Sequence, residues 1–246
     1  MAPLFPGGEV QDVGHAIWTM TTTPLLFANG VIRYDATDFE GPRSELELDN
    51  CLAAVATYDV PWRFSAWDHL GAEALVPRLL ARGMIEAGSD QAMWLDLPGA
   101  VRAEAGADGV DVRAATEACE RQMWTRIFLE VFGISWEYAE MFERIAARPH
   151  SRSLVAYSDG RPVGCMSMAI EEGLTVAYNV GVLPSERRRG VGRSLLLAAH
   201  RGAVTRGSRA CVVVVSRAGT DVCLRLGYHP VTRVTYLMPP PPASRP

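Results

Sequence analysis

The stretch PSERRRGVGRS, residues 184–194, constrains the fold more than any other part of the chain. It stands between a β-branched segment that ends at Leu183 and a segment whose apolar spacing predicts a helix from about Gly190 to Arg206. Backbone N–H groups at a helix start lack intrahelical partners, so a strand–loop–helix junction predicts an anion site. Glycines at 190 and 192 leave the backbone open to a pyrophosphate, and the neighbouring arginines can add charge-assisted hydrogen bonds.

Other interpretations of the arginines remain open at this point. A solvated basic loop explains RRRG by itself, without any ligand. A nucleic-acid patch is disfavoured by the net charge of −4 and by the lack of an aromatic stripe beside the arginines. A dinucleotide fingerprint does not fit, because only Gly-x-Gly is present, and the chain contains no lysine for a Walker motif.

Composition bounds the class of protein. The 246 residues are 48% hydrophobic and 21% charged, which is typical of a globular chain. Apolar runs such as Ala210–Val215 are far shorter than the roughly 20 residues of a membrane helix, and the N-terminus lacks the pattern of an export signal. The five cysteines are scattered without CxxC spacing, which favours neither disulfides nor zinc. We therefore expect a cytoplasmic protein.

Two modules are expected along the chain. The stretch EAGADGVD, Glu104–Asp111, is small, acidic and glycine-rich, and predicts a linker. It divides an α+β module at 1–105 from a second module at 108–238, and a polyproline-type tail follows at 239–246. In the first module the patterns predict strands within 15–34, 61–67 and 91–97 and helices over 45–57 and 73–82. Pro77 fits the second helix only within its first turn.

The second module has sharper signals. A helix is expected over Thr116–Phe132, ended by Gly133, and a second one from a Ser135 cap to about Ala147. Three strands follow within 153–184, with turns at Asp159-Gly160 and Glu172-Gly173. ACVVVV, residues 210–215, is typical of a strand buried on both faces. Strands at 110–115 and 230–238 and a short helix at 220–226 complete the module.

The longer run NVGVLPSERRRGVGRSLL resembles the acyl-CoA-binding signature of the GNAT N-acyltransferase superfamily, in which Gln/Arg-x-x-Gly-x-Gly/Ala follows a strand ending in Val-x-Pro. Arg187–Gly192 match the six positions, and Pro184 matches the proline. Downstream, VSRAGTDVCLRLGYHPV is similar to the closing segment of the family through Ser216, Gly219, Leu226, Gly227 and Tyr228. The element order β-αα-βββ-α-β-α-β agrees across 108–238. Residues 1–105 are only loosely similar, to degenerate N-terminal modules of two-part members.

The resemblance implies an α+β fold with a mixed sheet, an acyl-CoA co-substrate, most simply acetyl-CoA, and no metal. In the family the fourth strand splays from the fifth, the pantetheine arm pairs with the free strand edge, and the pyrophosphate lies on the loop N–H groups. The cofactor-binding residues that this implies are Val180, Gly181, Val182, Arg187, Arg188, Arg189, Gly190, Val191, Gly192, Arg193, Ser194 and Ser216.

The catalytic residues depart from the family pattern. Cys223 stands where members commonly carry a tyrosine as general acid, and Val176 stands near the usual position of a glutamate base. A cysteine on a short packed helix is also simply a small apolar residue. The candidates are therefore Cys223, Tyr178 on the strand, and Glu171 with Glu172 at the hairpin. An acceptor amine of lowered pKa needs no dedicated base.

We expect an N-acetyltransferase that moves acetyl from acetyl-CoA to the primary amine of a small molecule by direct attack, with the first module contributing to the acceptor site. It would act as a monomer or homodimer, without nucleic-acid or membrane partners. The alternatives are a CoA-ester-binding module without turnover, another acyl group, a protein amine or an O-acceptor, and a nucleic-acid-binding protein. The sequence leaves the acceptor open.

Overall fold

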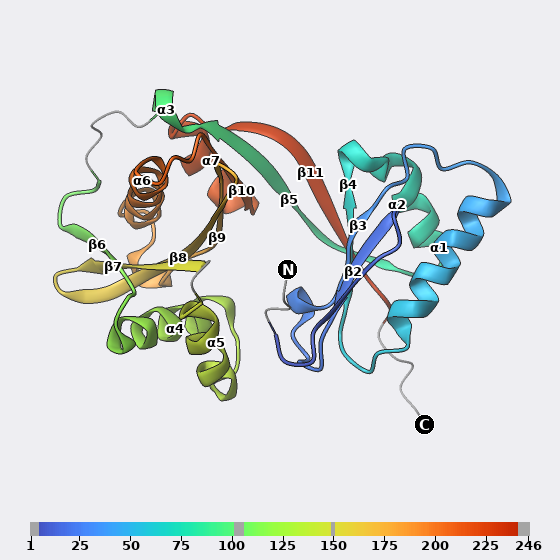
Figure 1. Ribbon diagram of the computed structural model, residues 1–246, viewed down its shortest axis with the longest axis horizontal. Coiled ribbons are helices and arrows are strands. Elements are labelled where there is room, and N and C mark those ends of the chain that lie inside the picture. Colours follow the sequence, from blue (N-terminus) through green and yellow to red (C-terminus); the bar gives the residue numbers. More distant parts are fainter. Residues whose placement is uncertain (1–4, 101–105, 149–150, 241–246) are drawn as a thin grey trace. The chain divides into compact units, whose positions relative to one another are not determined.

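A computed structural model describes residues 5–100, 106–148 and 151–240 (Figure 1). The chain forms two compact units, Met1–Gln91 with Thr232–Pro246 and Ala92–Val231. Strands β5 (Ile85–Asp96) and β11 (His229–Met238) each have residues in both units. Most of the expected tail and part of the expected linker lie outside the described residues. The division into 1–105 and 108–238 stays a prediction.

The second unit is a mixed sheet with the strand order β10-β9-β8-β7-β6. Strands β9 and β10 are parallel, and the other neighbours are antiparallel. Helix α6 lies on one face of this sheet, and α4 and α5 lie on the other (Figure 1). The element order confirms the expected mixed fold. The elements are α3 (Leu97–Ala100), β6 (Val110–Ala114), α4 (Ala118–Phe132), η3 (Trp136–Tyr138), α5 (Ala139–Ala146), β7 (Ser151–Ser158), β8 (Arg161–Glu171), β9 (Leu174–Val182), η4 (Pro184–Glu186), α6 (Val191–Val204), β10 (Ala210–Val215) and α7 (Arg217–Arg225).

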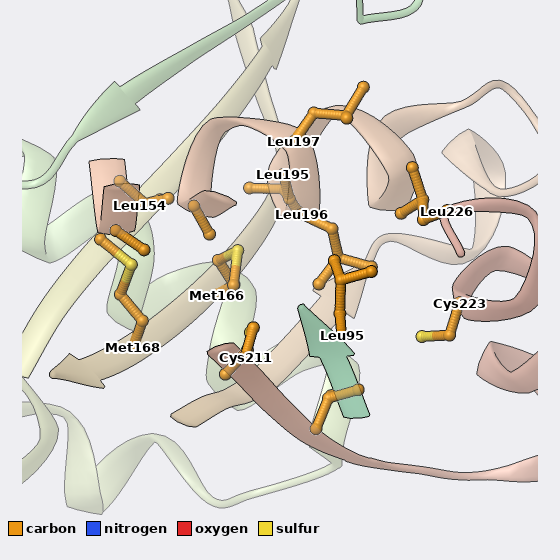
Figure 2. Packing of buried hydrophobic residues seen from close by; sticks show 14 of the residues in the cluster. Leu95, Leu154, Met166, Met168, Leu195, Leu196, Leu197, Cys211, Cys223 and Leu226 are labelled. Carbon is orange, nitrogen blue, oxygen red and sulfur yellow. The ribbon is translucent and has the colours of Figure 1, made fainter. Parts of the chain in front are cut away.

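The core of the second unit forms around α6. Apolar side chains on one face of the helix, such as Leu195, are fully buried against the sheet (Figure 2). Ala199, one turn later on the same face, is also fully buried. The sheet contributes alternate residues, such as Met166 and Met168 of β8 and Cys211 of β10. This pattern follows from a helix with period 3.6 packed on strands with period 2.

The two hairpin turns of this unit form where they were predicted. Asp159 and Gly160 have φ angles of 49° and 73°, and Glu172 and Gly173 have φ angles of 48° and 80°. Two consecutive positive φ angles are what a tight turn of type I′ needs, because its twist matches that of the strands. These turns fix the pairing of β7, β8 and β9.

Helix α4 begins two residues later than predicted and ends at the predicted residue. The Glu117 side chain bonds to the third backbone N–H of the helix, and the Glu120 side chain returns to the N–H of Glu117, which makes a reciprocal capping box. Gly133 ends the helix with a φ of 64°. The rings of Trp124 and Phe128 stack at 4.9 Å, and Phe142 of α5 packs against Phe128 at 4.7 Å.

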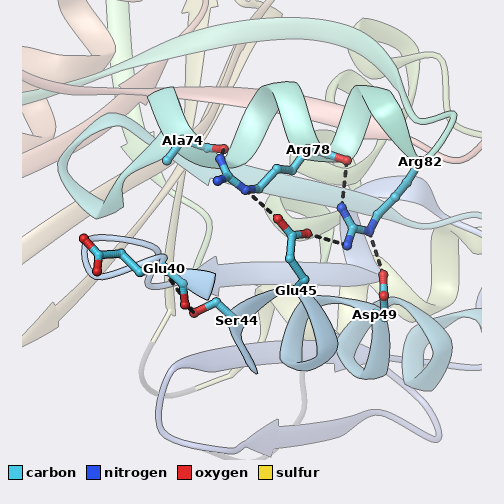
Figure 3. A network of polar contacts seen from close by, with 7 residues as sticks. All are labelled: Glu40, Ser44, Glu45, Asp49, Ala74, Arg78 and Arg82. Carbon is cyan, nitrogen blue, oxygen red and sulfur yellow. Dashed lines mark hydrogen bonds and ion pairs between the residues drawn. The ribbon is translucent and has the colours of Figure 1, made fainter. Parts of the chain in front are cut away.

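The first unit has the strand order β1-β2-β3-β4-β11. Glu45 of α1 accepts bonds from Arg78 of α2 at 2.9 Å and from Arg82, the residue after α2, at 2.7 Å (Figure 3). Arg82 also donates to Asp49 of α1 at 2.6 Å. These ion pairs join the two helices on the surface of this unit. Its elements are β1 (Glu9–Asp12), β2 (Ala16–Met20), η1 (Leu26–Ala28), β3 (Gly30–Tyr34), α1 (Gly41–Ala56), β4 (Arg63–Trp67), η2 (Asp68–Leu70) and α2 (Ala72–Ala81).

The expectation that Pro77 lies in the first turn of its helix is wrong. Helix α2 begins at Ala72, directly after Gly71 with its φ of 79°, so Pro77 is an interior residue without an N–H to donate. An interior proline costs about 3 kcal/mol relative to alanine. Leu75 and Leu79 on the same helix are fully buried in the core of this unit, and their burial offsets that cost.

The two units repeat one order of elements that the sequence letters do not reveal. In the first unit an antiparallel pair, β2 and β3, is followed by α1, the strand β4 parallel to β3, α2 and β5. In the second unit the antiparallel pair β8 and β9 is followed by α6, the parallel strand β10, α7 and β11. The loop before α1 is therefore the counterpart of the arginine–glycine loop before α6.

Candidate active site

Strand β9 carries an irregularity where the site is formed. Cys165 pairs with Gly181 and Ser167 pairs with Tyr178, so one more residue of β9 than of β8 lies between these pairs. Asn179 takes up this extra residue with a φ of 55°. The bulge frees the carbonyl of Met166, which accepts a 2.9 Å hydrogen bond from the indole N–H of the buried Trp124. Helix α4 thereby anchors the bulge.

Beyond the bulge, β9 separates from β10. The parallel ladder joins Leu174–Ala177 to Ala210–Val213, and no pair is formed past Ala177 among the described residues. Residues Tyr178–Val182 therefore keep an open edge on the side of β10. Unpaired strand edges present backbone groups that can bond to an extended ligand.

The backbone of Val182 faces this open edge. The neighbouring Leu183 N–H donates to the Val163 carbonyl of β8 at 3.0 Å. Since alternate residues of an antiparallel strand direct their backbone groups to opposite sides, the N–H and C=O of Val182 point away from β8. Its carbonyl accepts a 3.2 Å hydrogen bond from Nε of Arg187. The first arginine of the motif thus folds back onto the strand edge.

The loop after β9 leads this edge directly into α6. Arg188 has a φ of 64° and Gly190 has a φ of 81°, and α6 begins at the next residue. Ser194 donates the first N–H bond of the helix, to the Gly190 carbonyl at 2.9 Å. The N–H groups of Arg188, Arg189, Gly190, Val191 and Gly192 have no hydrogen-bond partner in the described part of the chain. Five unpartnered donors at a helix start form a cradle for an anion.

Both glycines of this cradle have a physical role. A Cβ on Gly190 would lie 2.6 Å from the Cβ of Ala107, and the positive φ favours glycine in any case. The Ser194 hydroxyl accepts the Ala107 N–H at 2.8 Å, so the segment before β6 lies against the start of α6. Gly192 is different: a Cβ there would meet only Val182 Cγ2, at 3.8 Å, so Gly192 keeps the cradle open without being required by packing.

The arginines of the loop are exposed. Arg189 pairs with Glu186 at 2.7 Å, which offsets part of its charge, and Arg187 is held at Val182. Val180 and Val182 are half-buried against the α6 core, and Gly181 is covered by Val131 and Phe132 of α4. Ser216 precedes α7, is exposed and makes no side-chain cap bond. The predicted cofactor-binding residues of β9 and the loop are thus contiguous.

The predicted catalytic residues are not brought together. Cys223 is 1% exposed, and burial raises the pKa of its thiol to about 12. Tyr178 directs its hydroxyl across β8 to Ser151 of β7, at 2.8 Å, and therefore away from the open edge. Glu171 pairs with Leu174 at the start of β9, and Glu172 occupies the turn, whereas the edge opens only after Ala177. The structure therefore does not bring these four side chains, two carboxylates, a phenol and a thiol, together at the open edge.

Three large apolar side chains that were not predicted as site residues are exposed on the second unit. Val214 of β10 is 40% exposed, so the expectation of a strand buried on both faces is wrong for one face. The reason is that the helices on that face, α4 and α5, contact β7, β8 and β9. Phe132 and Trp136, at the turn between α4 and α5, are 47% and 62% exposed. An apolar run shows that a strand is apolar, but not which neighbours cover it.

The counterpart loop of the first unit also has a glycine with a positive φ at the helix start, Gly41 with 71°, but it differs from the cradle in charge. It carries Asp35, Asp38 and Glu40, all exposed, where the other loop carries three arginines. Hydrogen bonds from the side chain and backbone of Thr37 lower the pKa of Asp35 and keep its carboxylate charged. Pro42 in the first turn of α1 has no N–H to donate. Although Arg43 follows Pro42, this loop is less favourable for an anion than the cradle.

Among the residues that the structure describes, no group of three or more His, Cys, Asp or Glu side chains could hold a metal ion. In the same part of the chain, every helix is too short or too polar to cross a membrane. All five cysteines are free, and only Cys119 is exposed.

The model of the acetyltransferase (GNAT) family matches residues 120–228, which span α4 to the end of α7 and include the whole cradle. Residues 120–228 form a GNAT acetyltransferase domain. The separation of β9 from β10 and the strand–cradle–helix sequence lie inside this GNAT domain.

Solved structures share the fold over nearly the whole chain. A GCN5-related N-acetyltransferase from Kribbella flavida is 19% identical with a TM-score of 0.72, covering 96% of this chain and 90% of its own. One from Sphaerobacter thermophilus is 18% identical with a TM-score of 0.67, covering 93% and 81%. A tandem GNAT protein from the clavulanic acid biosynthesis pathway is 14% identical with a TM-score of 0.64, covering 95% and 83%. No curated protein matches the sequence. At these identities the likeness establishes the fold, which agrees with the repeated element order.

Proposed function

We propose that the protein transfers an acetyl group from acetyl-CoA to the primary amine of a small molecule. The observation that carries this proposal is the continuity of the open edge Tyr178–Val182 with the five unpartnered N–H groups of the next loop. The backbone groups of the open edge can bond to the amides of the pantetheine arm of CoA. The N–H groups of the cradle can bind the pyrophosphate at the end of that arm. A single ligand with both parts would satisfy both sets of backbone groups.

The proposed reaction needs little side-chain chemistry. The neutral amine nitrogen attacks the thioester carbonyl, a C–N bond forms and the C–S bond breaks. CoA leaves as a thiolate that takes up a proton, and the positively charged nitrogen formed by the attack releases one proton to water, which gives the neutral amide. The chain would supply orientation and backbone N–H donors beside the bulge for the developing oxyanion. Cys223, with its thiol buried and its pKa raised, would contribute packing rather than a proton.

The test measures CoA release with a thiol reagent while purified protein is given acetyl-CoA and primary amines, with mass spectrometry of each product. Small-molecule amines and a lysine peptide are compared at equal concentration, and a reaction without amine corrects for hydrolysis. Release that depends on a small amine, with the matching acetylated product, supports the proposal. Release only with the peptide contradicts the small-molecule acceptor.

A second candidate function keeps the cofactor and omits the transfer. The buried Cys223 and the absence of a carboxylate on β9 favour a domain that binds a CoA ester without turnover. The same experiment separates the two functions when acetyl-CoA affinity is measured by calorimetry alongside it. Binding without turnover of any amine would support the binding domain.

A further inference from the structure

One face of the sheet beside the open edge is apolar and exposed. Ala177, Cys211 and Val213 are buried in the α6 core, so strand alternation places Val176, Val212 and Val214 on the opposite face. Val176 pairs with Val212, and Val176 and Val214 are 42% and 40% exposed. We call this valine patch, Val176, Val212 and Val214, the acceptor face. It adjoins the residues where β9 and β10 separate.

The aromatic ring of Phe132 lies beside this surface. Phe132 lies over the edge, since its Cε2 is 3.3 Å from the position of a Cβ on Gly181. Trp136 follows within the same turn between α4 and α5 and is 62% exposed. Tyr178 lies on the same side of β9, and because its hydroxyl bonds to Ser151, its polar end is turned away from the edge.

The acceptor face carries no charge of its own. Leu174–Val182 and Ala210–Val215 contain no acidic or basic residue. The neighbouring carboxylates are Glu171 at the end of β8, Glu172 in the hairpin turn and Glu137 beside Trp136, all of them exposed. Asp96 of β5 and Arg209 line a cavity with Leu174 and Ala210 at the far end of the two strands, so these charges lie at the rim of the valine patch. A cation placed on the valines would lose hydration without gaining a counter-charge, which is unfavourable. The same loss of hydration lowers the pKa of an ammonium and favours the neutral amine.

We infer that the acceptor is a monoamine with an apolar body, of the alkylamine or arylalkylamine class, and that the acceptor face selects it against amines with a second cationic group. The inference rests on the proposed function and adds the substrate class. An apolar body gains contact with the valines and with Phe132. The apolar surface that binds this body also lowers the pKa of the single ammonium group and favours the neutral amine, so no carboxylate base is required.

The test compares hexylamine with hexane-1,6-diamine at saturating acetyl-CoA, because the two differ only in a distal cation. We expect kcat/KM to be higher for hexylamine by roughly tenfold or more. The variants Val176→Asp and Val214→Asp place a carboxylate on the acceptor face and should each shift this ratio toward the diamine by about tenfold. Val231→Asp is the matched control, since Val231 is 62% exposed on β11 and lies outside the acceptor face. Val176→Thr, nearly isosteric, provides a milder change if an aspartate disturbs folding.

The outcomes separate this inference from the function on which it rests. A preference for hexylamine that Val176→Asp or Val176→Thr reduces and Val231→Asp leaves unchanged supports it. Equal or better use of the diamine overturns it while leaving the transferase intact, as does an equal effect of Val231→Asp. Acetyl-CoA binding without transfer to either amine or to any other amine overturns the proposed function, and the inference falls with it.

Discussion

Gly190 lies directly against Ala107, since a Cβ on Gly190 would be 2.6 Å from the Cβ of Ala107. Its φ of 81° adds a backbone cost for any other residue. We therefore expect Gly190→Ala to displace the first turn of α6. The free energy of unfolding should fall by about 1–3 kcal/mol, and acetyl-CoA should bind at least about tenfold more weakly. Chemical denaturation and calorimetry measure the two effects.

Gly207→Ala is the matched control for this change. Gly207 follows the C-terminal end of α6 with a φ of 79°, and a Cβ there would meet nothing within 4 Å. The substitution carries the same backbone cost but leaves the cradle untouched. It should lower stability without changing acetyl-CoA affinity. A similar loss of affinity in both variants would contradict the position of the cradle.

Cys223 should prove structural. Its side chain is 1% exposed, and burial raises its pKa to about 12, so the thiol is neither accessible nor ionised near neutral pH. Cys223→Ala should leave kcat within about twofold and cost about 1 kcal/mol of stability through the small cavity. Alkylation of the native protein with iodoacetamide should modify Cys119, the exposed cysteine, and spare Cys223. A large fall in kcat would make Cys223 part of the catalytic machinery.

The buried His200 predicts a loss of stability in acid. Its Nε2 lies 2.7 Å from the Tyr228 hydroxyl, and burial lowers its pKa to about 4, below the 6.5 of the unfolded chain. The folded state therefore holds His200 neutral. Its contribution is complete above pH 6.5 and is lost as the pH falls toward 4, by up to about 3 kcal/mol. Urea denaturation across this range should show that slope, and His200→Gln should flatten it. His229→Gln, at an exposed position, should leave it unchanged.

The two strand–loop–helix junctions predict a stoichiometry. The junction before α6 offers five N–H donors, whereas the junction before α1 carries Asp35, Asp38 and Glu40 and a proline in the first helical turn. Acetyl-CoA should therefore bind once per chain, and removal of the cradle should leave no second site. Calorimetric titration gives the number directly. Two equivalent sites per chain would show that the acidic junction binds the cofactor as well.

The local elements around the cradle could be predicted because short-range rules decide them. The dipeptides Asp159-Gly160 and Glu172-Gly173 fix hairpins, Gly133 ends α4, and the spacing of Val191 and Leu195 marks the buried face of α6. The order of these elements then limits the fold to a mixed sheet with helices on both faces. The family resemblance rested on the same stretch, and the match to residues 120–228 confirms it.

The side-chain geometry of the site depends on contacts between distant segments. The bulge at Asn179 depends on the pairing of β9 with β8 and on Trp124, which is far away in the sequence. The direction of the Tyr178 hydroxyl depends on Ser151 two strands away. The open face of β10 depends on how far α4 and α5 extend over the sheet. Hydrophobic periodicity and composition do not reveal such contacts. The candidate catalytic residues were chosen by their positions in the sequence motifs, and in the structure they do not lie close together.

The most direct test of the cradle uses Gly192→Val, measured by calorimetric titration with acetyl-CoA beside the unchanged protein. A Cβ at this position meets only Val182 Cγ2, at 3.8 Å, so the variant should fold with an unchanged Tm. Its side chain would nevertheless stand over the N–H groups that bind the pyrophosphate. We expect one site per chain in the unchanged protein and affinity at least about tenfold weaker in the variant. Equal affinity in the two proteins would contradict it.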